Sequence, residues 1–430
     1  MRRGNYGYFL LVLLIFSLFF LSCSSQNKNQ VLIWHWMTDR NQAFQKLAKE
    51  YEKETGVKVR FEIFFPPNVY AQKVQAAAQA GTLPDIFGIL GEKEYLASFV
   101  RRNLVVDFSP YFEEKPAWKE SFISQALEVS SFSKDNIYRV KAGIYGIPID
   151  FMNIQFLYNK ELFKKAGLDP NHPPRNFAEF IAQAKLLHQK LGVEGFICGW
   201  GETWLMYSLA LDFAFNIMGE KKVLDTFRGK YSYNSPGWVK VFSLFRQMKE
   251  AGIIPEGILT MANKEAEEIF ANQRAAFSFN GSWCVNVYQK LNPQLNYAPC
   301  LVPKVSNAYP RKIWGGAGAS FMVNAHSPRK EAAVKFLEWL TQKKQQDFLI
   351  RATNNLPAIK EAPDNLGLVL KEFRKGIDYV THPNLWPVYE KPKVIEKFTQ
   401  QLQKVILGEI TPAEAAAAVE KVKLRIIKRN

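Results

Sequence analysis

The chain has 430 residues, 47% of them hydrophobic, and a formal net charge of +16. This length can bury two separate cores, and so basic a balance raises the question of a nucleic-acid partner. The lysines and arginines are spread along amphipathic segments, without an arginine-rich cluster or zinc-finger spacing, which argues against nucleic acid. The five histidines and four cysteines follow no metal-ligand spacing, so we expect neither a metal nor a cofactor.

The N-terminal stretch MRRGNYGYFLLVLLIFSLFFLSC combines two arginines with an apolar run over residues 9–21. The run is too short to cross a bilayer comfortably, so residues 1–22 are predicted to be an export signal. Its end, FLSC, resembles the lipobox of bacterial lipoproteins, which implies lipidation of Cys23 and a polar tether over residues 23–30. A plain secretory signal or a short membrane anchor is the alternative. We expect an exported protein, anchored by lipid on the periplasmic or extracellular face of the cell membrane.

With Cys23 lipidated, three cysteines remain, and they can form one disulfide at most. The sequence does not choose the pair among Cys198, Cys284 and Cys300.

Strand and helix patterns alternate after the tether. Residues 31–36 are apolar and predict a strand, and residues 57–64 and 84–90 predict the next two strands. Between them, residues 41–56 and 70–81 predict amphipathic helices, the first with Phe44, Leu47, Ala48 and Tyr51 on one face and Gly56 as its stop. The alternation predicts an α/β fold with a parallel sheet covered on both faces. No glycine-rich phosphate motif lies in these turns, which excludes a dinucleotide-binding sheet.

Further along, residues 143–159 predict two short strands around Pro148 and Asp150, followed by a helix over 176–192 capped by Asn176. Helices dominate to about residue 270. Residues 296–303 and 320–324 predict strands, with the sequence WGGAGA (314–319) as a glycine loop between them. The next helix is predicted to begin with Ser327 as its cap and Pro328 at its first position. Near the end, TPAE (411–414) predicts a capping box.

The stretch FANQRAAFSFNGSW (270–283) predicts a helix end, a turn at Arg274 and a strand over 275–279 that breaks at Asn280–Gly281. Trp283 follows directly. A tryptophan in this position is either a core residue or a flat platform held out for a ligand.

Six segments in order, behind an export signal, resemble the extracellular solute-binding proteins of ABC importers, in the sugar-binding group that includes maltose-binding protein. The resemblance extends over nearly the whole mature chain. The segments are AGTLPDIFGIL (80–90), YGIPIDFMNIQFLYNKELFKKAGLDP (145–170), FANQRAAFSFNGSW (270–283), GGAGASFMVNAHSPRKEAAVKFLEWLT (315–341), NLPAIKEA (355–362) and LGEITPAEAAAAVEKV (407–422).

This resemblance implies a two-lobed α/β fold of the periplasmic-binding-protein type, with a hinge and a ligand cleft between the lobes. One lobe would comprise residues 31–149 and 314–375, the other residues 150–313 and 376–430. The chain would cross between them near residues 148–150, near 312–315 and near Gly376. Closure of the hinge around the solute is the motion that the resemblance implies.

The resemblance also places sugar-contacting residues on loops that face the cleft. Pyranose rings have apolar faces and hydroxyl edges, so such a site needs aromatic platforms with carboxylates and amides around them. The density of tryptophan favours more than one sugar ring, hence a di- or oligosaccharide. Trp283 matches the stacking tryptophan of the family. The candidate ligand-binding residues are Trp34, Trp36, Asp39, Glu92, Asp150, Asn153, Trp200, Glu202, Trp204, Asn280, Trp283, Trp314, Gly315 and Trp386.

The implied function is that of a monomeric receptor that captures a carbohydrate, delivers it to the transmembrane permease of an ABC importer and performs no reaction. An exported glycoside hydrolase would use a similar aromatic floor with two carboxylates, for which Asp39, Glu92, Asp150 and Glu202 are candidates. A binding protein for a polyol, a polyamine or a metal chelate is a second alternative, since an aromatic cage can hold an ammonium group. A basic adhesion lipoprotein without a small ligand would leave the cleft motifs unexplained.

Overall fold

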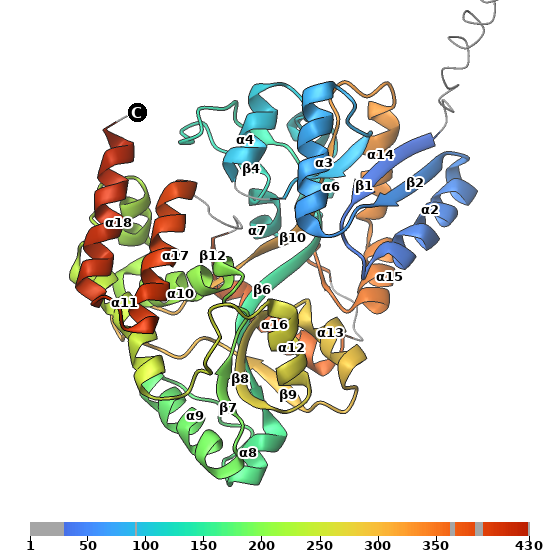
Figure 1. Ribbon diagram of the computed structural model, residues 1–430. Helices are drawn as coiled ribbons and strands as arrows, with labels where there is room; N and C mark the ends of the chain where they lie inside the picture. Colours follow the sequence, from blue (N-terminus) through green and yellow to red (C-terminus); the bar gives the residue numbers. More distant parts are fainter. Residues whose placement is uncertain (1–29, 91–92, 362–365, 383–389, 429–430) are drawn as a thin grey trace, which may run out of the picture.

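The computed structural model describes residues 30–428 apart from 91–92, 362–365 and 383–389. One sheet runs through the molecule in the strand order β2-β1-β3-β10-β6-β8-β7, with β9 and β11 added to β6 and β12 added to β10 (Figure 1). A separate pair is formed by β4 and β5. The strands are β1 (Gln30–His35), β2 (Lys58–Ile63), β3 (Ile86–Gly88), β4 (Ser131–Phe132), β5 (Gly143–Ile144), β6 (Ile147–Asn159), β7 (Glu194–Ile197), β8 (Ala275–Gly281), β9 (Tyr297–Cys300), β10 (Ile313–Val323), β11 (Leu356–Pro357) and β12 (Val380–His382).

Helices surround the sheet in two groups (Figure 1). Those near β1, β2 and β3 are α2 (Asn41–Thr55), α3 (Pro67–Ala80), α4 (Lys93–Arg101), α5 (Ser109–Glu114), α6 (Pro116–Ser121), α7 (Ser124–Glu128), α14 (Lys330–Leu340) and α15 (Lys343–Thr353). Those near β7, β8 and β9 or beyond are α8 (Lys160–Ala166), α9 (Phe177–Leu191), α10 (Thr203–Phe227), α11 (Pro236–Glu250), α12 (Asn263–Ala271), α13 (Cys284–Leu291), α16 (Leu368–Lys375), the 3₁₀ turn η1 (Gly376–Tyr379), α17 (Pro392–Leu407) and α18 (Pro412–Ile427). Each helix in the described part of the chain is too short or too polar to cross a membrane.

The local signals at several helix ends are confirmed. The predicted apolar face of α2 is buried, and Gly56 ends this helix in the left-handed conformation (φ 74°), donating its N–H to the carbonyl of Glu52. Glycine adopts this conformation without the steric cost of a side chain. Thr411 and Glu414 form the predicted capping box of α18, and Asn176 caps α9.

Four predicted details are wrong. The two short strands around Pro148 are one strand of 13 residues, β6, and the strand ahead of Trp283, β8, continues through Gly281. The glycine loop 314–319 is part of β10. Glycine is needed there because β10 runs close to its neighbours: a Cβ on Gly315 would lie 2.8 Å from the carbonyl oxygen of Met152. Ser327 does not cap α14; its hydroxyl accepts the N–H of Arg329 in the turn before the helix.

Two long antiparallel strands, β6 and β10, join the two groups of helices (Figure 1). The first half of β6 and the second half of β10 pack into cores with β1, β3 and α14, whereas the other halves pack into a larger core with β7, β8 and α10. The lobe boundaries predicted at residues 149/150 and 313/314 stay a prediction. Leu370 and Phe373 of α16 belong to the larger core, and the boundary predicted at 375/376 also stays a prediction.

Candidate functional site

A cavity of about 370 Å³ lies between the two groups of helices. We call it the cleft cavity. Its floor is β10 between Trp314 and Met322, and its walls come from segments that follow β1 and β3, from α4, from the end of α7 and, on the opposite side, from β6 and α10. The side chains that line it are mainly apolar. They include Trp36, Ile89, Leu90, Leu96, Val129, Met152, Trp204, Trp314, Ala317, Ala319 and Met322.

Three predicted tryptophans line the cleft cavity from different elements: Trp36 after β1, Trp204 on α10 and Trp314 on β10. Trp283 is half-buried beside them, and its ring centroid lies 5.9 Å from that of Trp204, with the two planes tilted by 49°. The structure therefore brings four of the predicted tryptophans to this region. Their broad apolar faces suit the apolar face of a ring-shaped solute.

Two of these tryptophans pack directly against a glycine. A Cβ on Gly88 would lie 2.4 Å from the ring of Trp36, and a Cβ on Gly281 would lie 1.9 Å from the ring of Trp283. Contacts below 3 Å do not occur between such atoms, so a side chain at either glycine would displace the indole. This is the physical reason for glycine beside tryptophan in the stretch NGSW.

Polar side chains fix the orientation of the indoles. Glu202, predicted as a ligand contact, accepts the indole N–H of Trp204 at 3.2 Å and the backbone N–H of Asn263 at 2.9 Å. Burial raises the pKa of Glu267, and hydrogen bonds from Asn280, Trp283 and Asn263 oppose this rise. A carboxylate with several donors stabilises the geometry of its partners, and so both glutamates support tryptophans.

On the opposite wall of the cleft cavity, a tyrosine fixes the position of Trp36. Tyr70 is fully buried, and its ring centroid lies 5.1 Å from that of Trp36. Its hydroxyl accepts the N–H of Gly88 at 2.8 Å and lies 2.9 Å and 3.1 Å from the carbonyl oxygens of Gly88 and Trp34, to which it donates. One hydroxyl thereby fixes both segments that place Trp36.

The polar groups of the cleft cavity were not predicted from the sequence. Lys93 is buried and donates to the carbonyl oxygens of Glu128 and Val129 at 2.9 Å and 2.7 Å. Burial lowers the pKa of Lys93 to about 7. The hydroxyls of Ser130 and Ser320 are buried, and neither has a hydrogen-bond partner among the residues that the structure describes. Among the described residues that line the cavity, none is a carboxylate.

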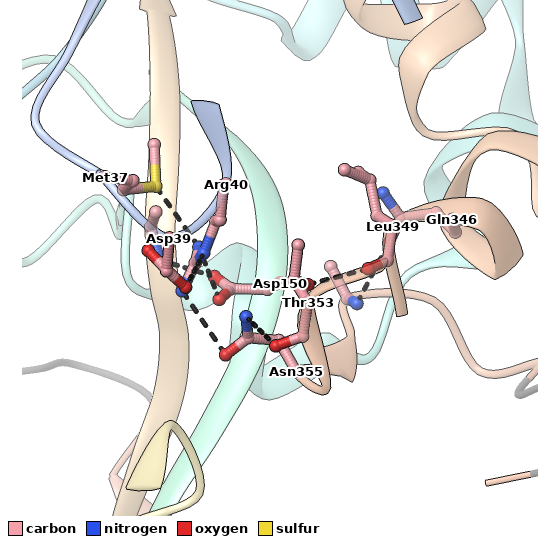
Figure 2. Close-up of polar contacts among 10 residues, drawn as sticks. Met37, Asp39, Arg40, Asp150, Gln346, Leu349, Thr353 and Asn355 are labelled. Atoms are coloured by element: carbon pink, nitrogen blue, oxygen red, sulfur yellow. Dashed lines mark hydrogen bonds and ion pairs between the residues drawn. The ribbon is translucent and has the colours of Figure 1, made fainter. Parts of the chain in front are cut away.

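Asp150, a predicted ligand contact, forms a buried ion pair instead (Figure 2). Its Oδ2 lies 2.6 Å from Nη1 of Arg40, and its Oδ1 accepts the N–H of Ala319 at 2.7 Å. Asp39 lies at the edge of the same cluster, with its Oδ2 3.4 Å from Nε of Arg40. No local pattern signals this pair, because its partners are 110 positions apart in the chain.

Several predicted residues are not brought to the cleft cavity. Trp200 is fully buried against Phe196 and Phe245. The buried amides of Asn153 and Asn280 donate to the carbonyl of Phe373 and to Glu267. Two more lie elsewhere: Gly315 is enclosed within the sheet, and Trp34 donates to Glu62 beneath the ammonium group of Lys73. Glu92, Trp386 and Cys23 lie outside the described residues.

Three cysteines lie in the described part of the chain. Cys198, Cys284 and Cys300 are free thiols. Burial raises the pKa of each of them, which disfavours the reactive thiolate. Over the described ranges, no group of three or more His, Cys, Asp or Glu side chains is placed to hold a metal ion.

The chain is similar in sequence or in fold to several known proteins. A binding protein of Brucella abortus is 27% identical over 331 residues, which cover 74% of this chain and 73% of the relative. The maltooligosaccharide ABC transporter solute-binding lipoprotein of Streptococcus pneumoniae is 22% identical, covering 74% and 70%. A solved structure from work on xylan utilisation by Caldanaerobius polysaccharolyticus superposes with a TM-score of 0.76 at 20% identity, covering 91% of this chain and 99% of that one. The two-lobed fold of such proteins is therefore the fold of this chain.

The family model described as bacterial extracellular solute-binding protein matches residues 34–347, which include the elements that form the cleft cavity. Together with the fold and the position of the cavity between β10, α4 and α10, this match shows that the chain belongs to the bacterial extracellular solute-binding protein family.

Proposed function

We propose that this protein is the receptor of an ABC importer that binds a neutral di- or oligosaccharide in the cleft cavity and delivers it, unchanged, to the transmembrane permease. The observation that carries the proposal is the lining of the cavity by Trp36, Trp204 and Trp314, with Trp283 beside them and no carboxylate among the described lining residues. Indole faces bind the apolar faces of sugar rings. The similarity to a maltooligosaccharide receptor and to a structure from work on xylan utilisation supports this class of solute.

The cleft cavity has room for a small part of an oligosaccharide. Ligand sites in proteins measure roughly 300–1,000 Å³, and the cleft cavity, at about 370 Å³, lies near the lower end of this range. A longer saccharide would extend out of its open side.

Closure of the two lobes is the proposed mechanism. Trp36 and Trp204 stand on opposite walls, one after β1 and the other on α10. A solute that contacts both binds the closed state better than the open one, and only this difference in affinity moves the equilibrium toward closure. The long strands β6 and β10 are the segments that would bend.

The location follows from the N-terminal sequence. We propose that Cys23 carries a lipid after removal of residues 1–22, and that the mature protein acts as a monomer on the outer side of the cell membrane. A lipoprotein among its relatives supports the anchor.

Hydrolysis of the bound saccharide is not expected. The hydrolase reading needs two carboxylates that flank one bond, and Asp150 is instead paired with Arg40, while Glu202 accepts two N–H groups beside Trp204. A polyamine would need carboxylate counter-charges inside the cavity, and none of the described lining residues is a carboxylate.

The test is isothermal titration of the protein beginning at Ser24 with maltotriose, xylotriose, chitotriose, a polyol and spermidine, with incubation of each saccharide to detect cleavage. Binding of one saccharide class, weakened by Trp204→Ala and not by the control Trp118→Phe on α6, supports the proposal. Binding of spermidine alone would refute the solute class, and release of shorter sugars would refute the receptor function.

A further inference from the structure

The floor of the cleft cavity contains an irregularity in the sheet. The pairing of β10 with β6 shifts register between Ala317 and Ala319 and again between Ala319 and Ser320. Gly318 therefore has no opposite residue in β6, and it lines the cavity. A residue of this kind is left unpaired and locally disrupts the ladder. Such bulges are frequent next to active sites.

Asp150 lies directly beneath this bulge. Its carboxylate oxygen Oδ1 accepts the N–H of Ala319 at 2.7 Å. A Cβ on Gly318 would lie 2.9 Å from the same oxygen, so the carboxylate occupies the space that a side chain at Gly318 would need. A side chain at Gly318 would therefore force the carboxylate of Asp150 to move.

Arg40 compensates the charge of Asp150. The exposed fractions of the two side chains are 11% and 8%, and their nitrogen and oxygen lie 2.6 Å apart. Further contacts hold the guanidinium in place, to Sδ of Met37 at 3.2 Å and to Oδ1 of Asn355 at 3.4 Å, the latter just before β11 (Figure 2). A buried carboxylate without such a partner would carry a large desolvation cost.

We propose that Asp150 is a positioning residue rather than a solute contact. Together with Arg40 it holds the bulge of β10, so that the peptide groups around Gly318 meet the hydroxyls of the solute. The side chains around the cavity are mainly apolar, and Lys93 already donates to two carbonyl oxygens. A solute rich in hydroxyls needs polar partners, and the bulge supplies them from the backbone. The part concerning hydroxyls rests on the proposed function; the part concerning the bulge does not.

Three substitutions separate the roles of charge, acceptor and space. Asp150→Asn keeps an oxygen that can accept the N–H of Ala319 and removes the charge. Asp150→Ala removes both. Gly318→Ala keeps both charged residues and inserts a methyl group against the carboxylate. The control is Asp107→Ala, because Asp107 also accepts backbone N–H groups, those of Ser109 and Ile144, and pairs with a lysine.

The first experiment needs no solute. Amide hydrogen exchange over residues 317–320 of the protein beginning at Ser24 reports local opening of the bulge. We expect Asp150→Ala to speed this exchange by about tenfold or more, and Asp150→Asn by about threefold at most, since the hydrogen bond is retained. Exchange that stays at the wild-type rate in Asp150→Ala, or that rises equally in Asp107→Ala, would overturn the positioning role. If Asp150→Ala does not fold, Gly318→Ala takes its place with the same expected increase.

The second experiment measures the affinity for whichever of maltotriose, xylotriose and chitotriose binds the wild type. We expect Gly318→Ala to weaken binding by about tenfold or more and Asp150→Asn by about threefold at most. A loss in Asp150→Asn as large as that in Gly318→Ala, with exchange at 317–320 unchanged, would show that the carboxylate contacts the solute and would overturn the inference. If none of the three binds, the proposed function fails, while the exchange measurement still decides whether Asp150 holds the bulge.

Discussion

Replacing Lys423 of α18 with methionine removes the partner of a buried carboxylate, that of Glu390 just before α17. Nζ of Lys423 lies 2.6 Å from Oε1 of Glu390, with exposed fractions of 5% and 0% for the two side chains. Breaking a buried ion pair from one side costs about 3–5 kcal/mol. Glu390 keeps two other donors, the hydroxyl of Tyr233 at 2.8 Å and the N–H of Lys391 at 2.7 Å. We therefore expect the lower end of that range, about 3 kcal/mol of unfolding free energy.

The matched control is Lys115→Met. Lys115 and Glu338 lie at the same distance, 2.6 Å, but with exposed fractions of 53% and 24%. Exposed pairs contribute about 0–1 kcal/mol because water screens them and both side chains lose freedom. Urea unfolding followed by tryptophan fluorescence measures both variants against the wild type.

The dependence on pH gives a second test of the same variant. Burial raises the pKa of Glu390, and Lys423 opposes this rise. Without the lysine the folded-state pKa rises further above the unfolded value. A carboxyl group shifted in this direction stabilises the fold at low pH and loses that contribution as the pH rises through the folded pKa. The destabilisation should thus be larger at about pH 8 than at about pH 5. A loss no greater than that of Lys115→Met, or one that grows toward low pH, would refute the reasoning.

Three further predictions concern the cleft cavity and the anchor. Trp204→Ala should weaken saccharide binding by about tenfold, or about 1.4 kcal/mol, in a titration. Trp200→Ala should instead cost about 3–5 kcal/mol of unfolding free energy, because that side chain is fully buried. If both variants lost affinity equally and neither lost stability, the placement of Trp200 in the core and of Trp204 at the cavity would be contradicted. Tyr70→Phe should cost about 1–3 kcal/mol in urea unfolding, since it leaves the buried N–H of Gly88 without its acceptor, and Tyr309→Phe, at an exposed position, serves as the control. Cys23→Ala in the full-length chain should abolish labelling by radioactive palmitate and release the protein from the membrane fraction; retention there without label would indicate an uncleaved anchor.

Local signals predicted a large part of the fold. Helix α2 could be read from its apolar face and from Gly56, and α18 from the capping box at Thr411, because each signal and its consequence lie within a few residues. The strands β6 and β10 could not be read in this way. Their glycines and proline indicate turns when taken alone, but Gly315 is required by the closeness of the neighbouring backbone, which is a property of the assembled sheet.

The same distinction applies to the predicted site. Three of the predicted tryptophans line the cleft cavity, and their contact with a solute stays a prediction. The roles of the polar residues were harder to predict. Asp150 and Glu202 carry carboxylates that could bind the hydroxyl of a solute. In the structure, Asp150 forms an ion pair with Arg40, and Glu202 accepts the indole N–H of Trp204. A carboxylate is as useful for holding a platform as for binding a hydroxyl, and only the position of its partner decides between the two.

Trp200 and Trp204 show how distant residues decide which of two neighbouring tryptophans lines the cleft cavity. They stand on either side of the turn GWGETW, and their own sequence does not distinguish them. The turn is pressed against residues 260–263: a Cβ on Gly199 would lie 2.3 Å from Cα of Asn263, and Gly201 donates its N–H to the carbonyl of Met261 at 2.9 Å. This contact directs Trp200 into the core beside Phe245 and leaves Trp204 at the start of α10, facing the cleft cavity. Bulkier residues at Gly199 or Gly201 should therefore disturb the site through Trp204 without touching the solute, since the segment 260–263 would have to move.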